Sequence, residues 1–132
     1  MRFAVVSAYL LGVALPVLET VRRGIPRLDG SETIAFLVDD WIVGALLLWA
    51  AISATRGVAS APVRLVMAWG VLVGGAYGSF FGQLESGAAT DVSGASNVLV
   101  AGVKGALFLV SILALIASMR AVGLQDAVSR QA

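Results

Sequence analysis

Four long apolar blocks, separated by short polar connections, constrain this chain more than any other feature of its sequence. They cover residues 3–21, 34–54, 65–82 and 98–119. At the helical rise of roughly 1.5 Å per residue, each block forms a helix roughly 27–33 Å long, which matches the hydrocarbon core of a membrane. We therefore predict an all-α fold in which residues 1–132 form one integral membrane domain, a four-helix bundle.

Composition supports a membrane environment. Hydrophobic residues make up 59% of the 132 residues and charged residues 13%, against roughly 45–50% and 25% in soluble domains. The absence of Cys and His excludes thiol catalysis, His-ligated haem and the usual zinc sites. The net charge of +1 indicates no nucleic-acid partner. We expect a multi-pass protein of a bacterial-type inner or plasma membrane, without cofactor or metal, and a non-enzymatic role is favoured.

The first block has an alternative interpretation as a signal peptide, because Arg2 precedes a short apolar core. No clear small-x-small cleavage site follows before Arg22 and Arg23, so we expect a retained helix that is kinked at Pro16. A soluble bundle would need a polar face on every helix, and segments such as 42–52 offer almost none. Four membrane helices are therefore favoured.

Basic residues predict the orientation, because short loops rich in Lys and Arg stay in the cytoplasm. Four spans put both termini on one side of the membrane. On that side lie Arg2, Arg56, Arg64, Arg120 and Arg130, and on the other lie Arg22, Arg23 and Arg27. We therefore predict that the N and C termini are cytoplasmic.

Three ionisable residues lie inside the apolar blocks, where a charge at the bilayer centre costs roughly 2.5–3.5 kcal/mol. Asp39 and Asp40 belong to the second block and Lys104 to the fourth. In this topology Asp40 and Lys104 lie at a similar depth, about 9–10 Å below the outer boundary, so they can pair. Neighbouring helix residues point about 100° apart, so we expect Asp40 to face the bundle interior and Asp39 to face a neighbouring helix or the membrane interface.

Other polar residues fall at the same end of the predicted helices, which indicates an outward-facing polar cluster. The candidate residues for binding a solute or ion are Asp39, Asp40, Lys104, Tyr77, Gln83, Glu19 and Arg23. Two other interpretations stay open. An Asp–Lys pair can simply fix the register of the helices. A hard cation can also bind to carboxylates, here drawn from Glu19, Asp39, Asp40 and Glu85.

The clearest repeat is the glycine ladder of the third block, by which we mean Gly70, Gly74, Gly78 and Gly82. In lipid such a ladder opens a groove that another helix backbone can approach closely. We favour packing of the ladder within the chain, against the first or second helix. Matching small residues there are Gly12, Ala14, Gly44, Ala45 and Ala51. Docking of a second copy or of another membrane protein is the alternative.

Capping and turn residues mark the helix boundaries. We expect Asn97 to cap the fourth helix and Pro62 to stand near the start of the third. The Gly- and Ser-rich residues 86–97 predict an exposed flexible loop. Residues 120–132 predict a short amphipathic segment on the membrane surface.

Three functions fit these features. The leading one is the binding or passage of a small polar or ionic solute, in a homo-oligomer because four short helices enclose little volume. The second is a non-catalytic accessory or assembly subunit that docks a larger membrane partner through the glycine ladder. The third is a membrane enzyme acting on lipid headgroups or isoprenoid phosphates, in which Arg22, Arg23 and Lys104 hold phosphate.

Overall fold

The computed structural model describes residues 1–23, 31–87, 89–91 and 93–130, and their side chains except those of 22, 23, 31–37, 126 and 128. The helices in these residues are α1 (Arg2–Arg23), α2 (Ser31–Thr55), α3 (Ala61–Glu85) and α4 (Asn97–Ser129). Each contains a stretch long and apolar enough to cross a membrane. The predicted all-helical fold with four long apolar helices is confirmed.

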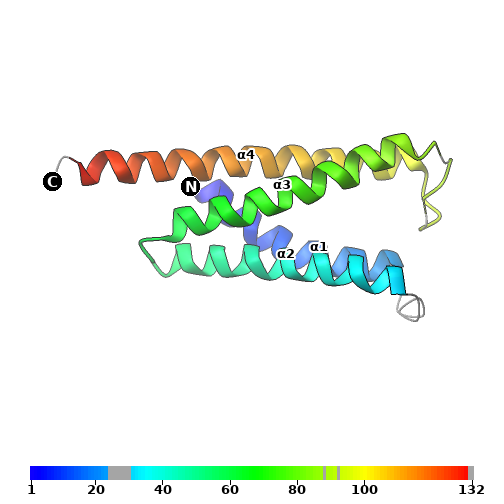
Figure 1. The fold of residues 1–132 in the computed structure, drawn as a ribbon, viewed down its shortest axis with the longest axis horizontal. Helices are drawn as coiled ribbons and strands as arrows, with labels where there is room; N and C mark the ends of the chain where they lie inside the picture. Colours follow the sequence, from blue (N-terminus) through cyan, green and yellow to red (C-terminus); the bar gives the residue numbers. More distant parts are fainter. Residues whose placement is uncertain (24–30, 88, 92, 131–132) are drawn as a thin grey trace.

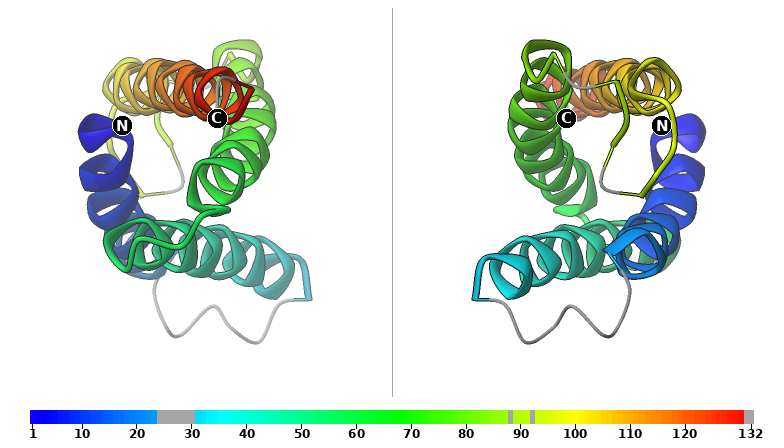
Figure 2. Two further views of the ribbon diagram at one scale, coloured as in Figure 1. Left: turned by 90° about the vertical axis from the view of Figure 1, so that its left-hand side faces the viewer. Right: turned by 90° about the vertical axis from the view of Figure 1, so that its right-hand side faces the viewer.

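Successive helices run in alternating, antiparallel directions along the bundle (Figure 1). α1 and α2 form one antiparallel hairpin, and α3 and α4 form another. α2 packs on α3 and α1 meets α4 over a shorter contact, so the helices form a ring when viewed along the bundle (Figure 2). We call the end with the start of α1 and the α2–α3 turn the termini end, and the end with the α3–α4 connection the loop end.

α4 is longer than the sequence predicted. It ends at Ser129 rather than at Met119, and its last part extends past the other helices at the termini end (Figure 1). The tail contains no Pro, and its Gly123 lies inside the helix, so nothing interrupts the backbone hydrogen bonds. The tail up to residue 129 is therefore helical and continuous with α4, and its placement on a membrane surface stays a prediction.

The start of α4 is capped by Ser96, and the prediction of Asn97 as the cap is wrong. Ser96 Oγ accepts a hydrogen bond from the backbone N–H of Leu99 at 3.3 Å, which is the usual geometry of an N-cap. Asn97 is already the first residue of the helix, and its side chain bonds to α3 instead. Pro62 stands in the first turn of α3, as predicted.

A few large side chains fill the bundle core among many small ones. Trp69, Leu47 and Leu65 are the largest apolar side chains that are fully buried in helices α2 and α3. The small residues of the same core cluster are Ala4, Ala8, Ala50, Ala51, Ala68 and Ala114. Alanines bring the helix backbones near enough to enclose one indole ring, and this close packing is the main attraction between helices in lipid.

α1 and α2 approach each other closely at Gly12 and Gly44. A Cβ atom on Gly44 would stand 2.7 Å from the Gly12 carbonyl oxygen and 2.6 Å from Pro16 Cγ. Pro16 has no N–H to donate to the Gly12 carbonyl four residues earlier. The hydrogen of Gly44 Cα that replaces a Cβ is directed at that carbonyl and can supply a weak C–H···O contact.

The α2–α3 turn is fastened by Arg64. Its Nη1 donates a hydrogen bond to Ser53 Oγ at 2.9 Å, and its guanidinium lies 4.5 Å from the centre of the Trp49 ring. A guanidinium over an indole face is attracted by the ring quadrupole. Gly57 adopts a φ of 68°, a conformation that favours glycine, and lets the chain reverse within a few residues.

Large apolar side chains cover the outside of the bundle. Exposed residues include Leu10 and Val13 on α1, Trp41 on α2, and Leu109 and Leu113 on α4. Soluble monomers rarely expose continuous apolar surface of this extent. The outer surface therefore suits lipid, in agreement with the length and apolarity of the helices.

The Gly12–Gly44 contact predicts that the loss of stability caused by replacing a glycine depends strongly on which glycine is replaced. Gly44→Leu forces α1 away from α2, and we expect the free energy of unfolding in detergent to fall by about 1–3 kcal/mol. Gly102→Leu on α4 is the matched control, because a Cβ there meets no described atom within 4 Å. Equal losses of stability in both variants would contradict the assignment of this contact.

Candidate functional site

Lys104 lies in the second turn of α4 and is held by α3. Its Nζ donates to Gln83 Oε1 at 2.5 Å and to the Ser79 carbonyl oxygen at 3.3 Å. The side chain is half-buried. An ammonium group that enters an apolar helix must find acceptors to offset the loss of water, and α3 supplies these two.

Gln83 is the centre of this network and is 91% buried, with 9% of its surface exposed. Its Nε2 donates to Asn97 Oδ1, and it approaches Asp91 Oδ1 at 3.4 Å. Asn97 Nδ2 returns a hydrogen bond to the Gln83 carbonyl oxygen at 3.2 Å. We call Ser79, Gln83, Asp91, Asn97 and Lys104 the polar clasp, because its bonds join the end of α3 to the loop and to α4.

The described part of the α3–α4 connection is mostly exposed, as predicted, and is folded on itself by hydrogen bonds; its flexibility stays a prediction. Asp91 accepts hydrogen bonds at Oδ2 from the N–H of Ser93 at 3.1 Å and from its hydroxyl at 2.9 Å. Gly94 has a φ of 82° and donates its N–H to the Asp91 carbonyl at 2.9 Å. The sequence Asp91-Val-Ser-Gly is a turn signal that could have indicated this structure.

Aromatic rings lie beside the polar clasp, between α3 and α4. Tyr77 and Phe81 have ring centres 4.6 Å apart, and Phe80 and Phe108 are stacked at 6.1 Å. Gly105 gives the Phe80 ring its space, since a Cβ there would stand 3.0 Å from the ring. These rings make the surroundings of the clasp apolar, which strengthens its hydrogen bonds.

The candidate residues named from the sequence divide into two groups. Lys104 and Gln83 are in direct contact, and Tyr77 belongs to the neighbouring aromatic rings. Asp39 and Asp40 are on α2, which packs on α1 and α3. Asp40 is half-buried and Asp39 is exposed, a difference in the expected direction.

The remaining candidates lie on α1. Glu19 is half-buried in its last turns, and the side chains of Arg22 and Arg23 are outside the described part of the structure. The bonds that we describe for Lys104 come from α3. A contact between Asp40 and Lys104 stays a prediction.

The hard-cation interpretation is not supported. Within the described side chains, no three residues of the types Asp, Glu, His or Cys gather in a way that could hold a metal ion. The four carboxylates considered from the sequence, Glu19, Asp39, Asp40 and Glu85, belong to this described set. They therefore do not form one ligand group.

The glycine ladder does not pack within the chain, so this sequence expectation is wrong. A Cβ added at Gly70, Gly74, Gly78 or Gly82 would meet no described atom within 4 Å outside its own helix backbone and chain neighbours. The four residues are exposed, while Leu65 and Trp69 on the opposite face of α3 are buried. The face of α3 that carries Leu65 and Trp69 packs in the core, and the face that carries the glycine ladder points outward.

Comparison of the chain with protein-family models, with curated proteins and with solved structures finds no match.

The hydrogen bond between Lys104 and Gln83 predicts strong coupling between the two residues. We expect the losses of stability in Gln83→Leu and Lys104→Met to be non-additive, with a coupling of about 0.5–2 kcal/mol measured by unfolding in detergent. Lys104→Met combined with Ser53→Ala, at the other end of the bundle, is the additive control. Simple additivity in the first pair would show that the contact contributes nothing to stability.

Proposed function

We propose that this chain is a non-catalytic accessory or assembly subunit that docks another membrane protein through the outward face of α3. The observation that carries the proposal is the open space beside the glycine ladder, where the chain has no described atom within 4 Å of an added Cβ. Met67, Val71 and Tyr77 are exposed on the same helix and border the ladder. In this proposal the stripe of exposed small residues between larger exposed side chains serves as the groove for the partner helix.

The energetics of glycine in a helix support an intermolecular contact. Each glycine in a helix interior costs roughly 0.5–1 kcal/mol relative to alanine. In lipid that cost is offset when a second backbone approaches and makes van der Waals and C–H···O contacts along the groove. A four-residue repeat drifts about 40° per step around the helix, so the partner helix crosses obliquely and in a right-handed sense.

The state of the charged residues also favours docking over solute transfer. The described bonds of Lys104 and Gln83 join elements of the same chain, as expected of a structural clasp. One shallow surface pocket, lined by Val38, Trp41, Ile42 and Ala45, is apolar and includes none of the candidate charged residues. The proposal therefore assigns the partner contact to the glycine ladder and the stability of the α3–α4 hairpin to the polar clasp.

Leucine substitution in the ladder tests this assignment. We expect Gly74→Leu and Gly78→Leu to abolish co-purification of the partner, or dimerisation if the partner is a second copy, because the side chain fills the groove. The thermal midpoint of the purified chain should stay within about 2 °C of the parent value, because an added Cβ at these positions meets no described atom within 4 Å. Native mass spectrometry of the membrane extract measures both stoichiometry and partner mass.

Photo-crosslinking locates the contact independently. A photoreactive residue at Val71, beside the ladder, should capture the partner, while one at Leu113, exposed on α4, should not. Equal capture at both positions would contradict docking through α3. Unfolding of Gly74→Leu or Gly78→Leu would instead support packing of the ladder within the chain.

Solute binding is the second candidate, and the position of Lys104 favours it. The ammonium lies about 10 Å along an apolar helix, near the end where Asp40 is half-buried on α2. Charges retained inside membrane helices commonly mark ion or proton pathways. In this candidate Asp40 and Lys104 carry the solute or proton, and Tyr77, Gln83, Glu19 and Arg23 line its path.

Neutralising the two charges separately tests the second candidate. We expect Asp40→Asn and Lys104→Met each to abolish proton uptake by vesicles loaded with a pH-sensitive dye, because each removes a group that the pathway needs. Asp39→Asn is the control, since Asp39 is exposed. Circular dichroism establishes that each variant is folded, and full uptake by both folded variants would exclude the pathway.

A further inference from the structure

The two ends of the bundle carry opposite charge. Arginines at the termini end are Arg2, Arg56, Arg64, Arg120 and Arg130. The acidic side chains that the structure describes all lie toward the loop end, and they are Glu19, Asp39, Asp40, Glu85 and Asp91. In the sequence only Asp126, in the extended part of α4, adds an acidic residue at the termini end. This end therefore attracts anions.

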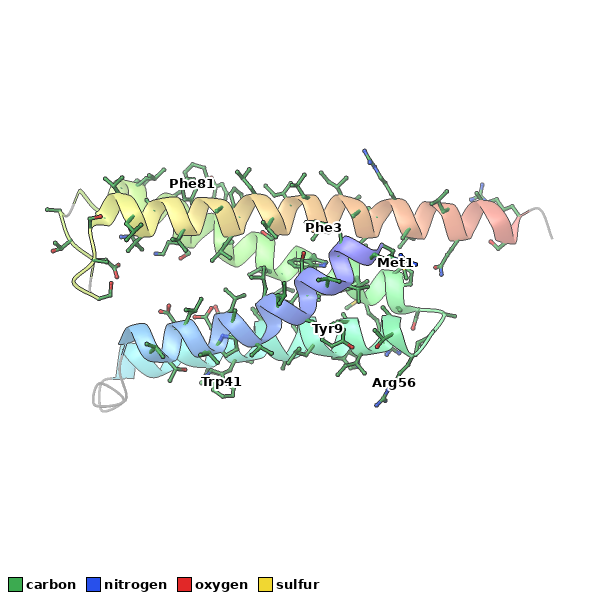
Figure 3. The ribbon with its side chains drawn as sticks, turned by 180° about the vertical axis from the view of Figure 1, so that it is seen from behind. Met1, Phe3, Tyr9, Trp41, Arg56 and Phe81 are labelled. Carbon is green, nitrogen blue, oxygen red and sulfur yellow. The ribbon has the colours of Figure 1, made fainter. Side chains whose placement is uncertain are left out.

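A groove opens on this basic end, between the start of α1 and the end of α2. The residues that line it are Met1, Arg2, Val5, Val6, Ala54 and Thr55. Val6 is exposed, and Arg56 follows Thr55 at the same end as Met1 (Figure 3). Below the groove the Tyr9 hydroxyl bonds to Thr55 Oγ1 at 3.0 Å and ties the two helices together. The groove is thus lined mainly by apolar side chains. Arg2 is the charged residue of this lining, and we call the end of the groove at Arg2 its mouth.

We infer that this groove binds an anionic phospholipid, with the phosphate at Arg2 and one acyl chain along Val5, Val6 and Ala54. Arg2 begins α1 and Thr55 ends α2, so the mouth lies where the apolar spans stop and headgroups begin. Arg56 lies at the same end of the bundle, but its side chain points away from Met1 (Figure 3), so Arg2 is the arginine that we assign to the phosphate. A guanidinium binds phosphate by two parallel N–H···O bonds.

The charge of Arg2 and the apolar lining of the groove favour an anionic phospholipid over other ligands. A free anion would use the arginines and leave the apolar wall in contact with water or detergent, whereas a phospholipid satisfies both parts. A zwitterionic lipid carries a choline or ammonium group that this end of the bundle repels. Each arginine near a membrane surface strengthens binding of an anionic lipid by about fivefold.

Native mass spectrometry of the full-length chain with added phosphatidylglycerol or phosphatidylcholine tests the inference. We expect one tightly bound phosphatidylglycerol and at least about fivefold weaker binding of phosphatidylcholine. Arg2→Gln should weaken phosphatidylglycerol binding about fivefold, while Arg130→Gln, which removes the same charge outside the groove, should change it less than twofold. Ala54→Leu, which fills the apolar wall, should weaken it as well, unlike Ala106→Leu on the exposed face of α4.

Three outcomes would overturn the inference. Equal binding of the two lipids would remove the role of charge, and equal effects of Arg2→Gln and Arg130→Gln would remove the role of the groove. Inorganic phosphate that displaces phosphatidylglycerol at millimolar concentration would identify a free anion as the ligand.

Discussion

The bundle depends on the close approach of helix backbones, because lipid offers no hydrophobic gain when one apolar helix leaves it for another. Van der Waals contact at short range must supply the attraction, and only small residues permit it. Gly12 and Gly44 bring α1 to α2 until a Cβ would overlap the opposing backbone. Alanines on α1, α2 and α4 do the same around Trp69, which is fully buried. The proposed contact of the glycine ladder with a partner extends the same principle outside the chain.

The polar clasp provides hydrogen-bond acceptors for Lys104, whose ammonium group would otherwise be costly in an apolar helix. Gln83 accepts from the ammonium on one side and bonds to Asn97 on the other, so one buried amide joins α3, the loop and α4. Removing either partner leaves a polar group without its described bond in an apolar region, which costs more than the bond itself contributes. A clasp of this kind defines the register of the α3–α4 hairpin whether or not a solute ever reaches it.

Charge distinguishes the two ends of the molecule. The loop end holds most of the carboxylates and the polar clasp, together with Arg22 and Arg23, whereas the described acidic side chains are absent from the arginine-rich termini end. Arg64 is engaged with Ser53 and Trp49 in the α2–α3 turn. Arg2 instead lines a groove between α1 and α2. The two proposed contacts, an anionic lipid at the termini end and a protein partner along α3, use separate surfaces and are compatible with each other.

The sequence by itself determined the four apolar helices and placed Gln83 and Lys104 at the same end of the bundle, because block length and helical spacing set which residues share an end. The partner that it predicted for Lys104 was Asp40, and the bond to Gln83 was decided by the tertiary structure. It could not assign Asn97 and Asp91 to the clasp, since their role depends on how the loop folds back. It placed the glycine ladder inside the chain, and tertiary structure decided otherwise. Helical periodicity defines which residues share a face of α3. Which face meets α2 depends on how Trp69 is packed, and its packing involves core residues from all four helices.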